Sequence, residues 1–231
     1  VCVVIPVYNA PEETDRCLAS VRRCTPEGVR ILVLDDASPD ARVGAVLERH
    51  GADPRVEVRR NRENLGFTRN VNQGMSLAGD ADVVLLNADT EVGPLWLQNL
   101  LMAAYSGDRV GTATPFSDNA GAFSAPEIGQ ANPLPPGVDT DAAARAIAQA
   151  PLRLYPETPT GNGYCLYIRR DCLTETGPFD AEAFPRGYGE ENDFCMRARA
   201  RGWTHVVDDA GYVRHVRSAS FGEEKAALLK Q

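Results

Sequence analysis

The chain has 231 residues, 43% of them hydrophobic, which fits one globular domain or a closely joined two-part domain. Its formal net charge of −8 argues against nucleic acid as a partner, because a polyanion is bound by a basic face. No apolar run approaches the roughly 20 residues of a membrane span and no signal peptide is visible, which argues against membrane-spanning and secreted proteins.

The first half of the chain alternates short apolar runs with amphipathic segments. Strands are predicted at 1–7, 29–34, 56–60 and 83–86, and helices from Pro11 to about Cys24, at 41–50 and at 68–77. Pro11 suits the first turn of its helix, because the missing N–H would have no helical partner there. This order predicts an α/β fold with a single Rossmann-like, mostly parallel sheet that is flanked by helices and joined by right-handed crossovers.

The pattern is less regular after Asp89. Helices are predicted at 94–105, 139–150, 171–176, 190–201 and 223–229, and strands at 110–114, 164–168, 204–207 and 212–216. The stretch 116–136 is rich in Pro, Ser, Asn, Ala and Gly and is predicted to be a long irregular loop. Loops of this length in compact domains are often functional.

The cysteines and the first residue bear on the cellular compartment and on the domain organisation of the protein. The six cysteines show no CxxC or zinc-like spacing, and several occupy apolar positions, so we interpret them as reduced core residues of a cytoplasmic protein. The chain begins inside an apolar strand without a methionine, which suggests a domain taken from a larger multidomain chain.

Polar side chains follow three of the predicted parallel strands. No GxGxxG or GxxxxGK[ST] motif occurs, which argues against dinucleotide-binding and P-loop domains. In open α/β sheets, ligands bind at the carboxyl ends of the strands. Each polar group alone is more often turn chemistry, but together they favour a ligand site. The residues are Tyr8 and Asn9, Asp35 and Asp36, and Asn87 and Asp89.

The segment from Asn64 to Asn70 precedes a predicted helix. Gly66 allows close approach of the backbone, Arg69 can clamp a phosphate, and a helix N-terminus favours anions. A plain loop with Thr68 as the N-cap is the alternative.

Asp89 directly follows a buried strand and is a candidate ligand for a hard cation, which would neutralise a diphosphate leaving group. Taken alone, this residue could equally be a helix cap. His215 follows a later apolar strand and offers a softer ligand, although a lone histidine is more often a surface or core residue.

Three carboxylates, Glu190, Glu191 and Asp193, begin a predicted helix and are candidates for a catalytic base. The helix N-terminus stabilises their charge. Glu190 and Glu191 diverge by roughly 100° around the helix, so only one of them need face a substrate, whereas Glu190 and Asp193 share a face. A capping cluster without chemistry is the alternative. Gly187 and Gly189 bracket Tyr188 in the preceding loop.

Five motifs occur in an order and spacing that resemble the inverting family 2 glycosyltransferases, which have the GT-A fold. The part from Tyr188 to Arg199 most resembles the rhamnosyltransferase-like branch of bacterial cell-surface polysaccharide assembly. The motifs are Pro6-Val7-Tyr8-Asn9, Asp35-Asp36-Ala37-Ser38, Asn64-Leu65-Gly66-Phe67 with Arg69-Asn70, Asn87-Ala88-Asp89, and Gly189-Glu190-Glu191-Asn192-Asp193-Phe194.

The resemblance implies a role for each motif. Asp89 would bind Mg²⁺ or Mn²⁺, His215 would be a second contact to the metal or diphosphate, and Glu191 would be the base. Asn87 stands where the family has an acid, and Glu191 where it more often has Asp. The nucleotide-sugar would be bound by the strand ends and loops, at Pro6, Tyr8, Asn9, Asp35, Asp36, Asn64, Gly66, Arg69 and Asn87.

The resemblance therefore implies a metal-dependent inverting hexosyltransferase that acts in cell-surface polysaccharide synthesis. We expect residues 1–90 to bind a UDP- or dTDP-linked donor and residues 91–231 to bind a glycan or lipid-linked glycan acceptor, in the cytoplasm near the inner face of the membrane. An inactive nucleotide-sugar-binding module of a larger synthase is the alternative. A hydrolase with a carboxylate pair is a third hypothesis, which leaves the polar strand ends unexplained.

Overall fold

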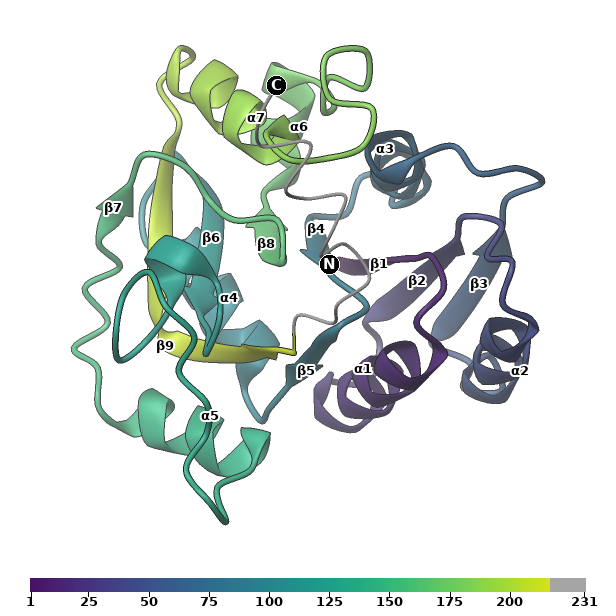
Figure 1. The fold of residues 1–231 in the computed structure, drawn as a ribbon. Helices are drawn as coiled ribbons and strands as arrows, with labels where there is room; N and C mark the ends of the chain where they lie inside the picture. The colour runs from purple at the N-terminus through teal and green to yellow at the C-terminus, as the bar shows by residue number, and fades with distance from the viewer. Residues whose placement is uncertain (217–231) are drawn as a thin grey trace.

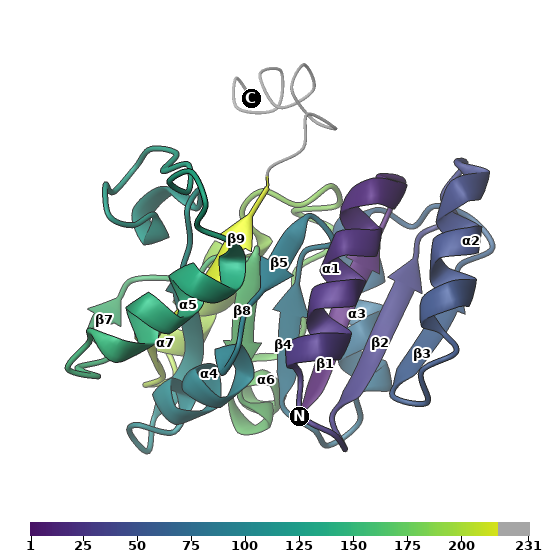
Figure 2. The same cartoon turned by 90° about the horizontal axis from the view of Figure 1, so that it is seen from below.

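A nine-stranded sheet crosses the described part of the protein, and helices cover both of its faces (Figures 1 and 2). The computed structural model describes residues 1–216, so the helix predicted at 223–229 lies outside the described residues. The strands are β1 (Cys2–Val7), β2 (Arg30–Asp35), β3 (Val56–Arg60), β4 (Val83–Leu86), β5 (Thr90–Val92), β6 (Val110–Phe116), β7 (Glu157–Thr158), β8 (Cys165–Ile168) and β9 (Thr204–His215). The helices are α1 (Pro11–Cys24), α2 (Ala41–His50), α3 (Phe67–Leu77), α4 (Trp96–Ala104), a 3₁₀ turn (Gly121–Phe123), α5 (Thr140–Gln149), α6 (Arg170–Thr176) and α7 (Glu190–Arg199).

The first half of the sheet has the predicted parallel arrangement. Strands β3, β2, β1 and β4 lie side by side in this order, and all three pairings are parallel. The side chains of β4 are all buried, as expected for parallel strands that helices cover on both faces. The carboxyl ends of β1, β2 and β4 therefore meet at one edge of the sheet, as the ligand-site hypothesis requires.

The second half of the sheet is mixed, and the sequence predicted no strand directions for this irregular half. Strand β8 runs antiparallel to both β4 and β6, whereas β6 and β9 are parallel. An apolar run indicates that a strand is buried but carries no information about its direction, which the connections decide.

Strand β9 is one strand of 12 residues, where two short strands were predicted. Asp208, Asp209 and Gly211 indicate a turn in sequence, but β9 stays paired with β6 through a register shift between Pro115 and Phe116. Asp208 is fully buried, which raises its pKa to about 7, and its carboxylate accepts a hydrogen bond from the backbone of Ala210. Strands β5 and β7 were not predicted, and both pair antiparallel with β9.

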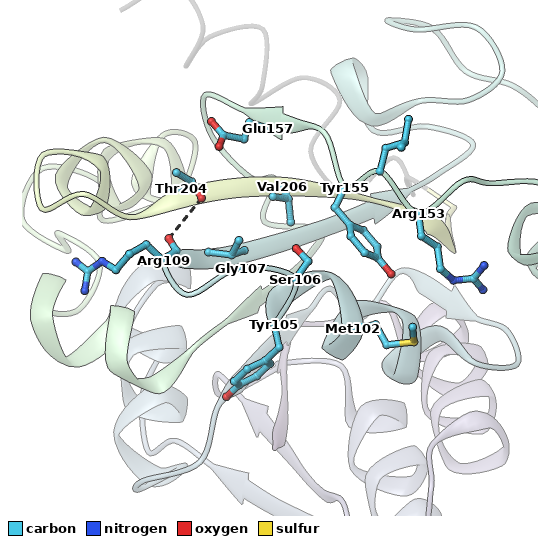
Figure 3. Close-up of a pocket in the computed structure, with 12 residues that line it drawn as sticks. Met102, Tyr105, Ser106, Gly107, Arg109, Arg153, Tyr155, Glu157, Thr204 and Val206 are labelled. Carbon is cyan, nitrogen blue, oxygen red and sulfur yellow. Dashed lines mark hydrogen bonds between the residues drawn. The ribbon is translucent and has the colours of Figure 1, made fainter.

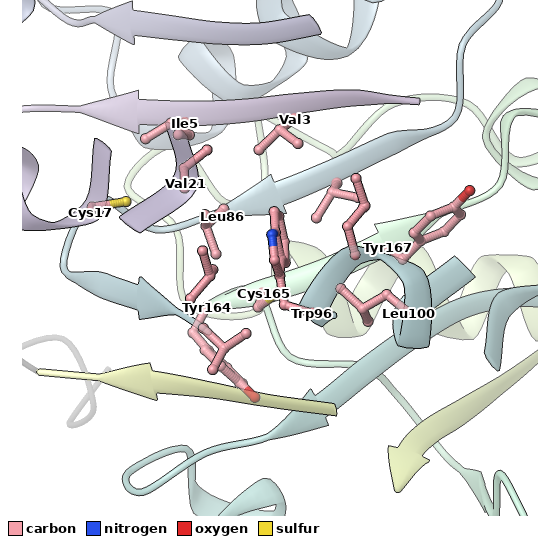
Figure 4. Packing of buried hydrophobic residues seen from close by; sticks show 14 of the residues in the cluster. Val3, Ile5, Cys17, Val21, Leu86, Trp96, Leu100, Tyr164, Cys165 and Tyr167 are labelled. Carbon is pink, nitrogen blue, oxygen red and sulfur yellow. The ribbon is translucent and has the colours of Figure 1, made fainter. Parts of the chain in front are cut away.

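Apolar side chains pack on both faces of the sheet. On one face, α1 places Cys17 and Val21 against Ile5, and Trp96 fills the space above β4 and β8 (Figure 4). Each fully buried side chain of this size contributes roughly 1.5–3 kcal/mol to folding. All six cysteines are free thiols and five of them are buried, while Cys24 is partly exposed. Within residues 1–216, no helix combines the length and the apolar character needed to cross a bilayer.

Candidate active site

The turn after β4 is fixed through its backbone. The N–H of Asn87 donates to the carbonyl of Tyr164 at the start of β8 (2.9 Å), and the Asn87 carbonyl accepts from the N–H and the hydroxyl of Thr90 (3.2 and 2.7 Å). These bonds hold Asp89, which is half-buried, at the carboxyl edge of the parallel strands.

Asp89 and His215 lie side by side, although they are far apart in sequence. Thr90 pairs with His215 in the antiparallel β5–β9 ladder, and the N–H of Val216 donates to the Asp89 carbonyl (2.9 Å). As a result, Nε2 of His215 lies 3.4 Å from Oδ1 of Asp89. The structure thus brings together the two residues predicted to bind a metal.

The orientation of the His215 ring fits a metal ligand. Its Nδ1 lies 3.0 Å from the carbonyl oxygen of Asn119, and its face stacks on Tyr164 with ring centroids 5.3 Å apart. Because a carbonyl can only accept, Nδ1 carries the proton, and in the neutral ring the lone pair of Nε2 points toward Asp89. Metal-binding histidines commonly donate their other N–H to a carbonyl or carboxylate in this way.

The donor set at this edge is small. Residues 1–216 contain no group of three or more His, Cys, Asp or Glu side chains that could hold a metal together. Asp89 and His215 would therefore leave most coordination positions of an Mg²⁺ or Mn²⁺ ion to water and substrate. That is how Mg²⁺ is usually bound beside phosphates.

Glu191 lies on the side of α7 that faces the start of β8. A Cβ at Gly163 would lie 3.9 Å from the carboxyl carbon of Glu191. The residue after Gly163 is Tyr164, whose carbonyl accepts the hydrogen bond from the N–H of Asn87. Oε2 of Glu191 is buried and has no hydrogen-bond partner in the described protein. Buried carboxylate oxygens are normally paired, so this oxygen is a candidate partner for a substrate hydroxyl.

Glu190 points in a different direction from Glu191, in agreement with the helix geometry. A Cβ on Gly187 would lie 3.7 Å from both carboxylate oxygens of Glu190 and 3.3 Å from the Phe67 ring. Glu190 is only 4% exposed, and its Oε2 also has no hydrogen-bond partner in the described residues.

Asp193, the third carboxylate of the predicted catalytic cluster, forms an ion pair with Arg197 (2.7 Å). Arg197 also donates to the carbonyls of Thr176, the last residue of α6, and of Pro178. The structure therefore places Asp193 in the contact between α6 and α7, away from Glu191.

Most of the polar strand-end residues bind neighbouring loops. Asp35 accepts from the N–H of Ser38 and from Arg60, and the side chain of Asn9 accepts from the N–H of Asp40. Asp36 accepts three hydrogen bonds, from Asn61, Leu65 and Gly66. The other residues predicted to contact the nucleotide-sugar differ in exposure. Pro6 and Asn87 are half-buried, whereas Tyr8, Asn64 and Arg69 are exposed.

Gly66 allows a close approach, but to protein backbone. Its φ is +82°, and a Cβ there would lie 2.7 Å from the Pro185 carbonyl oxygen. Thr68 donates to the Phe184 carbonyl beside this contact. The predicted donor loop is therefore packed against the loop that leads into Glu190 and Glu191.

The family described as glycosyl transferase family 2 matches residues 2–175. The chain belongs to this family. A similar relative, at 30% identity over 98% of this chain and 79% of its own length, is the N-acetylglucosaminyl-diphospho-decaprenol L-rhamnosyltransferase of Mycobacterium tuberculosis.

Two solved structures share the GT-A fold with this glycosyltransferase. GalNAc-T7 with UDP, GalNAc and Mn²⁺ superposes with a TM-score of 0.72 at 20% identity, over 93% of this chain and 43% of that one. The mannosyltransferase PcManGT from Pyrobaculum calidifontis, with GDP-Man and Mn²⁺, superposes with a TM-score of 0.69 at 16% identity, over 95% and 57% of the two chains. This chain thus spans about half the length of those two proteins, and they show its fold alone.

A surface cavity of about 820 Å³ lies elsewhere on the glycosyltransferase (Figure 3). It is lined by the end of α4 with Met102 and Tyr105, by the start of β6 and β9, and by Arg153 to Tyr155. None of its lining residues was predicted to bind donor, metal or acceptor. Asp89, His215 and Glu191 do not line this cavity, so the candidate site is separate from it.

The burial of Glu190 predicts that the stability of the glycosyltransferase depends on pH. Burial, and then the neighbouring charge of Glu191, raise the pKa of Glu190 from its ordinary value of 4.5 to about 7. The folded protein thus binds this proton more tightly than the unfolded chain. Its stability is expected to fall by about 3 kcal/mol as the pH rises from 4.5 to 7. Glu190→Gln should remove this loss, which urea unfolding at pH 5 and pH 8 will measure.

The exposed Glu48 gives a matched control for that measurement. Glu48→Gln should keep the pH dependence of the parent protein. An unfolding free energy of Glu190→Gln that varies with pH as in the parent would contradict the assignment to Glu190.

Tyr164, Asn119 and Asp118 surround His215, and none of them was predicted from the sequence to be a site residue. Tyr164 occurs in a predicted strand, where an aromatic residue indicates core packing. Asn119 and Asp118 fall in the stretch 116–136, and its length was the one available signal of function.

Proposed function

We propose that the protein is a metal-dependent inverting glycosyltransferase that moves rhamnose or a similar hexose from a dTDP- or UDP-linked donor to a lipid-linked N-acetylglucosaminyl diphosphate. The single observation that carries this proposal is that His215 lies beside Asp89 in a family 2 chain and stacks on Tyr164, the residue next to Gly163, which Glu191 approaches. The relative at 30% identity supports the choice of sugar and acceptor.

Asp89 and His215 would hold an Mg²⁺ or Mn²⁺ ion. When bound, this ion neutralises negative charge on the diphosphate as it leaves. The described residues fit such an ion because a carboxylate oxygen faces an imidazole nitrogen whose ring is already oriented by Asn119.

Glu191 would act as the base. Its carboxylate takes the proton from the acceptor hydroxyl, while that oxygen forms a bond to the anomeric carbon on the face opposite the diphosphate. The bond from the anomeric carbon to the diphosphate oxygen breaks in the same displacement, so the configuration is inverted. No enzyme nucleophile is needed for this single step.

The remaining predicted residues would serve the donor within residues 1–90. Tyr8 and Arg69 are exposed at the rim and would contact the nucleoside and the diphosphate, and the amide of Asn87 would face the donor beside Asp89. Asp36 would act by holding the loop at Leu65 and Gly66. Residues 91–231 would bind the acceptor, at the cytoplasmic face of the membrane.

The test is a transfer assay on the purified protein. dTDP-rhamnose and a panel of UDP-sugars are supplied with Mn²⁺ or Mg²⁺ and a lipid-linked N-acetylglucosaminyl diphosphate, and the product is analysed by mass spectrometry and NMR. We expect one added sugar with inverted configuration. Donor binding without turnover would instead support a binding module, and release of free sugar without acceptor would support a hydrolase.

A further inference from the structure

The loop that follows β6 is closed on itself beside His215. The N–H of Ser117 donates to the Phe123 carbonyl, and the Ser117 carbonyl accepts from the N–H of Ala125 (3.0 and 2.9 Å). The hydroxyl of Ser124 accepts from the N–H of Ala120 (2.9 Å). Ser117 and Ser124 are buried, so this loop presents Asp118 and Asn119 in a fixed arrangement.

Asp118 contacts His215 directly. Its Oδ1 accepts the backbone N–H of His215 (2.7 Å) and lies 3.2 Å from the Ser117 hydroxyl, while its Oδ2 lies 3.8 Å from Nε of Arg214. The adjacent residue, Asn119, accepts the Nδ1 proton of the same histidine through its carbonyl. The backbone and ring of His215 are thus both bound by consecutive residues of one loop.

We propose that Asp118 is a positioning residue for His215. Its carboxylate holds the loop and β9 together, so that the Asn119 carbonyl keeps the proton on Nδ1 and the Nε2 lone pair stays directed at Asp89. The binding of a metal rests on the proposed function, whereas the orientation and tautomer of His215 do not.

The chain allows the tautomer to be observed, because it contains only three histidines. In His50, Nδ1 lies 3.3 Å from Nη1 of Arg22, and in His205, Nε2 lies 3.0 Å from the Cys195 carbonyl. A guanidinium can only donate and a carbonyl can only accept, so both of these rings carry the proton on Nε2 when neutral. His215 should be the one ring with the proton on Nδ1.

The first experiment is ¹⁵N NMR of the full chain labelled at histidine, at pH 8, with His215→Asn used to assign the signals. We expect two Nε2–H rings and one Nδ1–H ring, the latter being His215. Addition of Mn²⁺ with dTDP should broaden the His215 signals selectively. An Nε2–H tautomer of His215 in the parent protein would overturn the proposal without any variant of Asp118.

The second experiment measures Mn²⁺ binding by EPR in the presence of dTDP. Asp118→Ala should bind Mn²⁺ about 10–100-fold more weakly, the usual cost of losing a residue that orients a metal ligand. Asp118→Asn keeps an oxygen acceptor for the His215 N–H and should retain most of the affinity. Asp171→Asn, at a side chain that is 74% exposed, is the matched control and should bind as the parent does.

Two results separate this proposal from the proposed function. If Asp118→Ala gave the parent tautomer and the parent Mn²⁺ affinity, the role of Asp118 would be refuted. If the parent bound no Mn²⁺ with dTDP, the metal part of the proposed function would fail, and mixed His215 tautomers in Asp118→Ala would still support the positioning role. Thermal melts of each variant show whether a loss reflects unfolding.

Discussion

Asp89→Ala is expected to lower sugar transfer on the order of 10²–10³-fold, which is the cost of removing one preorganised electrostatic contact to developing charge. The substitution would leave His215 as the remaining protein ligand of the proposed pair. The fold should persist, because the contacts of Asp89 to β9 include a backbone bond from Val216. Steady-state kinetics across Mn²⁺ concentrations will show the loss, together with a higher metal requirement.

The exposed Asp80 provides a matched control for Asp89. Asp80→Ala also removes one carboxylate but should leave transfer unchanged. Transfer by Asp89→Ala at the parent rate, with the parent dependence on Mn²⁺, would exclude Asp89 as a metal ligand.

Glu191→Gln is expected to lower transfer by about 10²–10⁴-fold, the usual contribution of a positioned general base. The amide has nearly the same shape but cannot accept the proton of the acceptor hydroxyl. Donor binding should be preserved, because Glu191 lies beside Gly163 and not at the ends of β1 and β2. Turnover is measured at saturating donor and acceptor, and donor affinity by calorimetry.

Two neighbouring carboxylates test whether that loss is specific. Asp193→Asn should weaken the α6–α7 contact through Arg197 and leave most of the activity of the folded protein. Glu190→Gln should mainly change the pH dependence of stability. If Glu190→Gln abolished transfer and Glu191→Gln did not, the base would have to be reassigned to Glu190.

The first half of the fold could be predicted because the local pattern and the tertiary arrangement agree. Continuous apolar runs such as Val83 to Leu86 are buried on both faces by the helices that alternate with them. The meeting of Asp89 with His215 could be predicted only through the family resemblance, since nothing in the local sequence pairs β5 with β9.

The remaining features depend on contacts distant in sequence. Thr90 to Val92 form a strand only because they pair with β9, and the buried Asp208 continues a strand where its sequence indicates a turn. Asp36 looks like a ligand contact, and the structure shows that its oxygens already accept hydrogen bonds from a neighbouring loop. A carboxylate at a strand end has the same sequence signature in either role.

The β5–β9 ladder determines which sequence changes this site can tolerate, substitutions or changes in chain length. Because Thr90 is paired with His215, backbone hydrogen bonds set the distance between the two proposed metal ligands. The half-buried side chains along these strands can vary without moving the imidazole. One residue inserted or deleted near the end of β9 would turn the imidazole of His215 to the other face of the strand. During divergence, changes in chain length at this point should therefore be far rarer than substitutions.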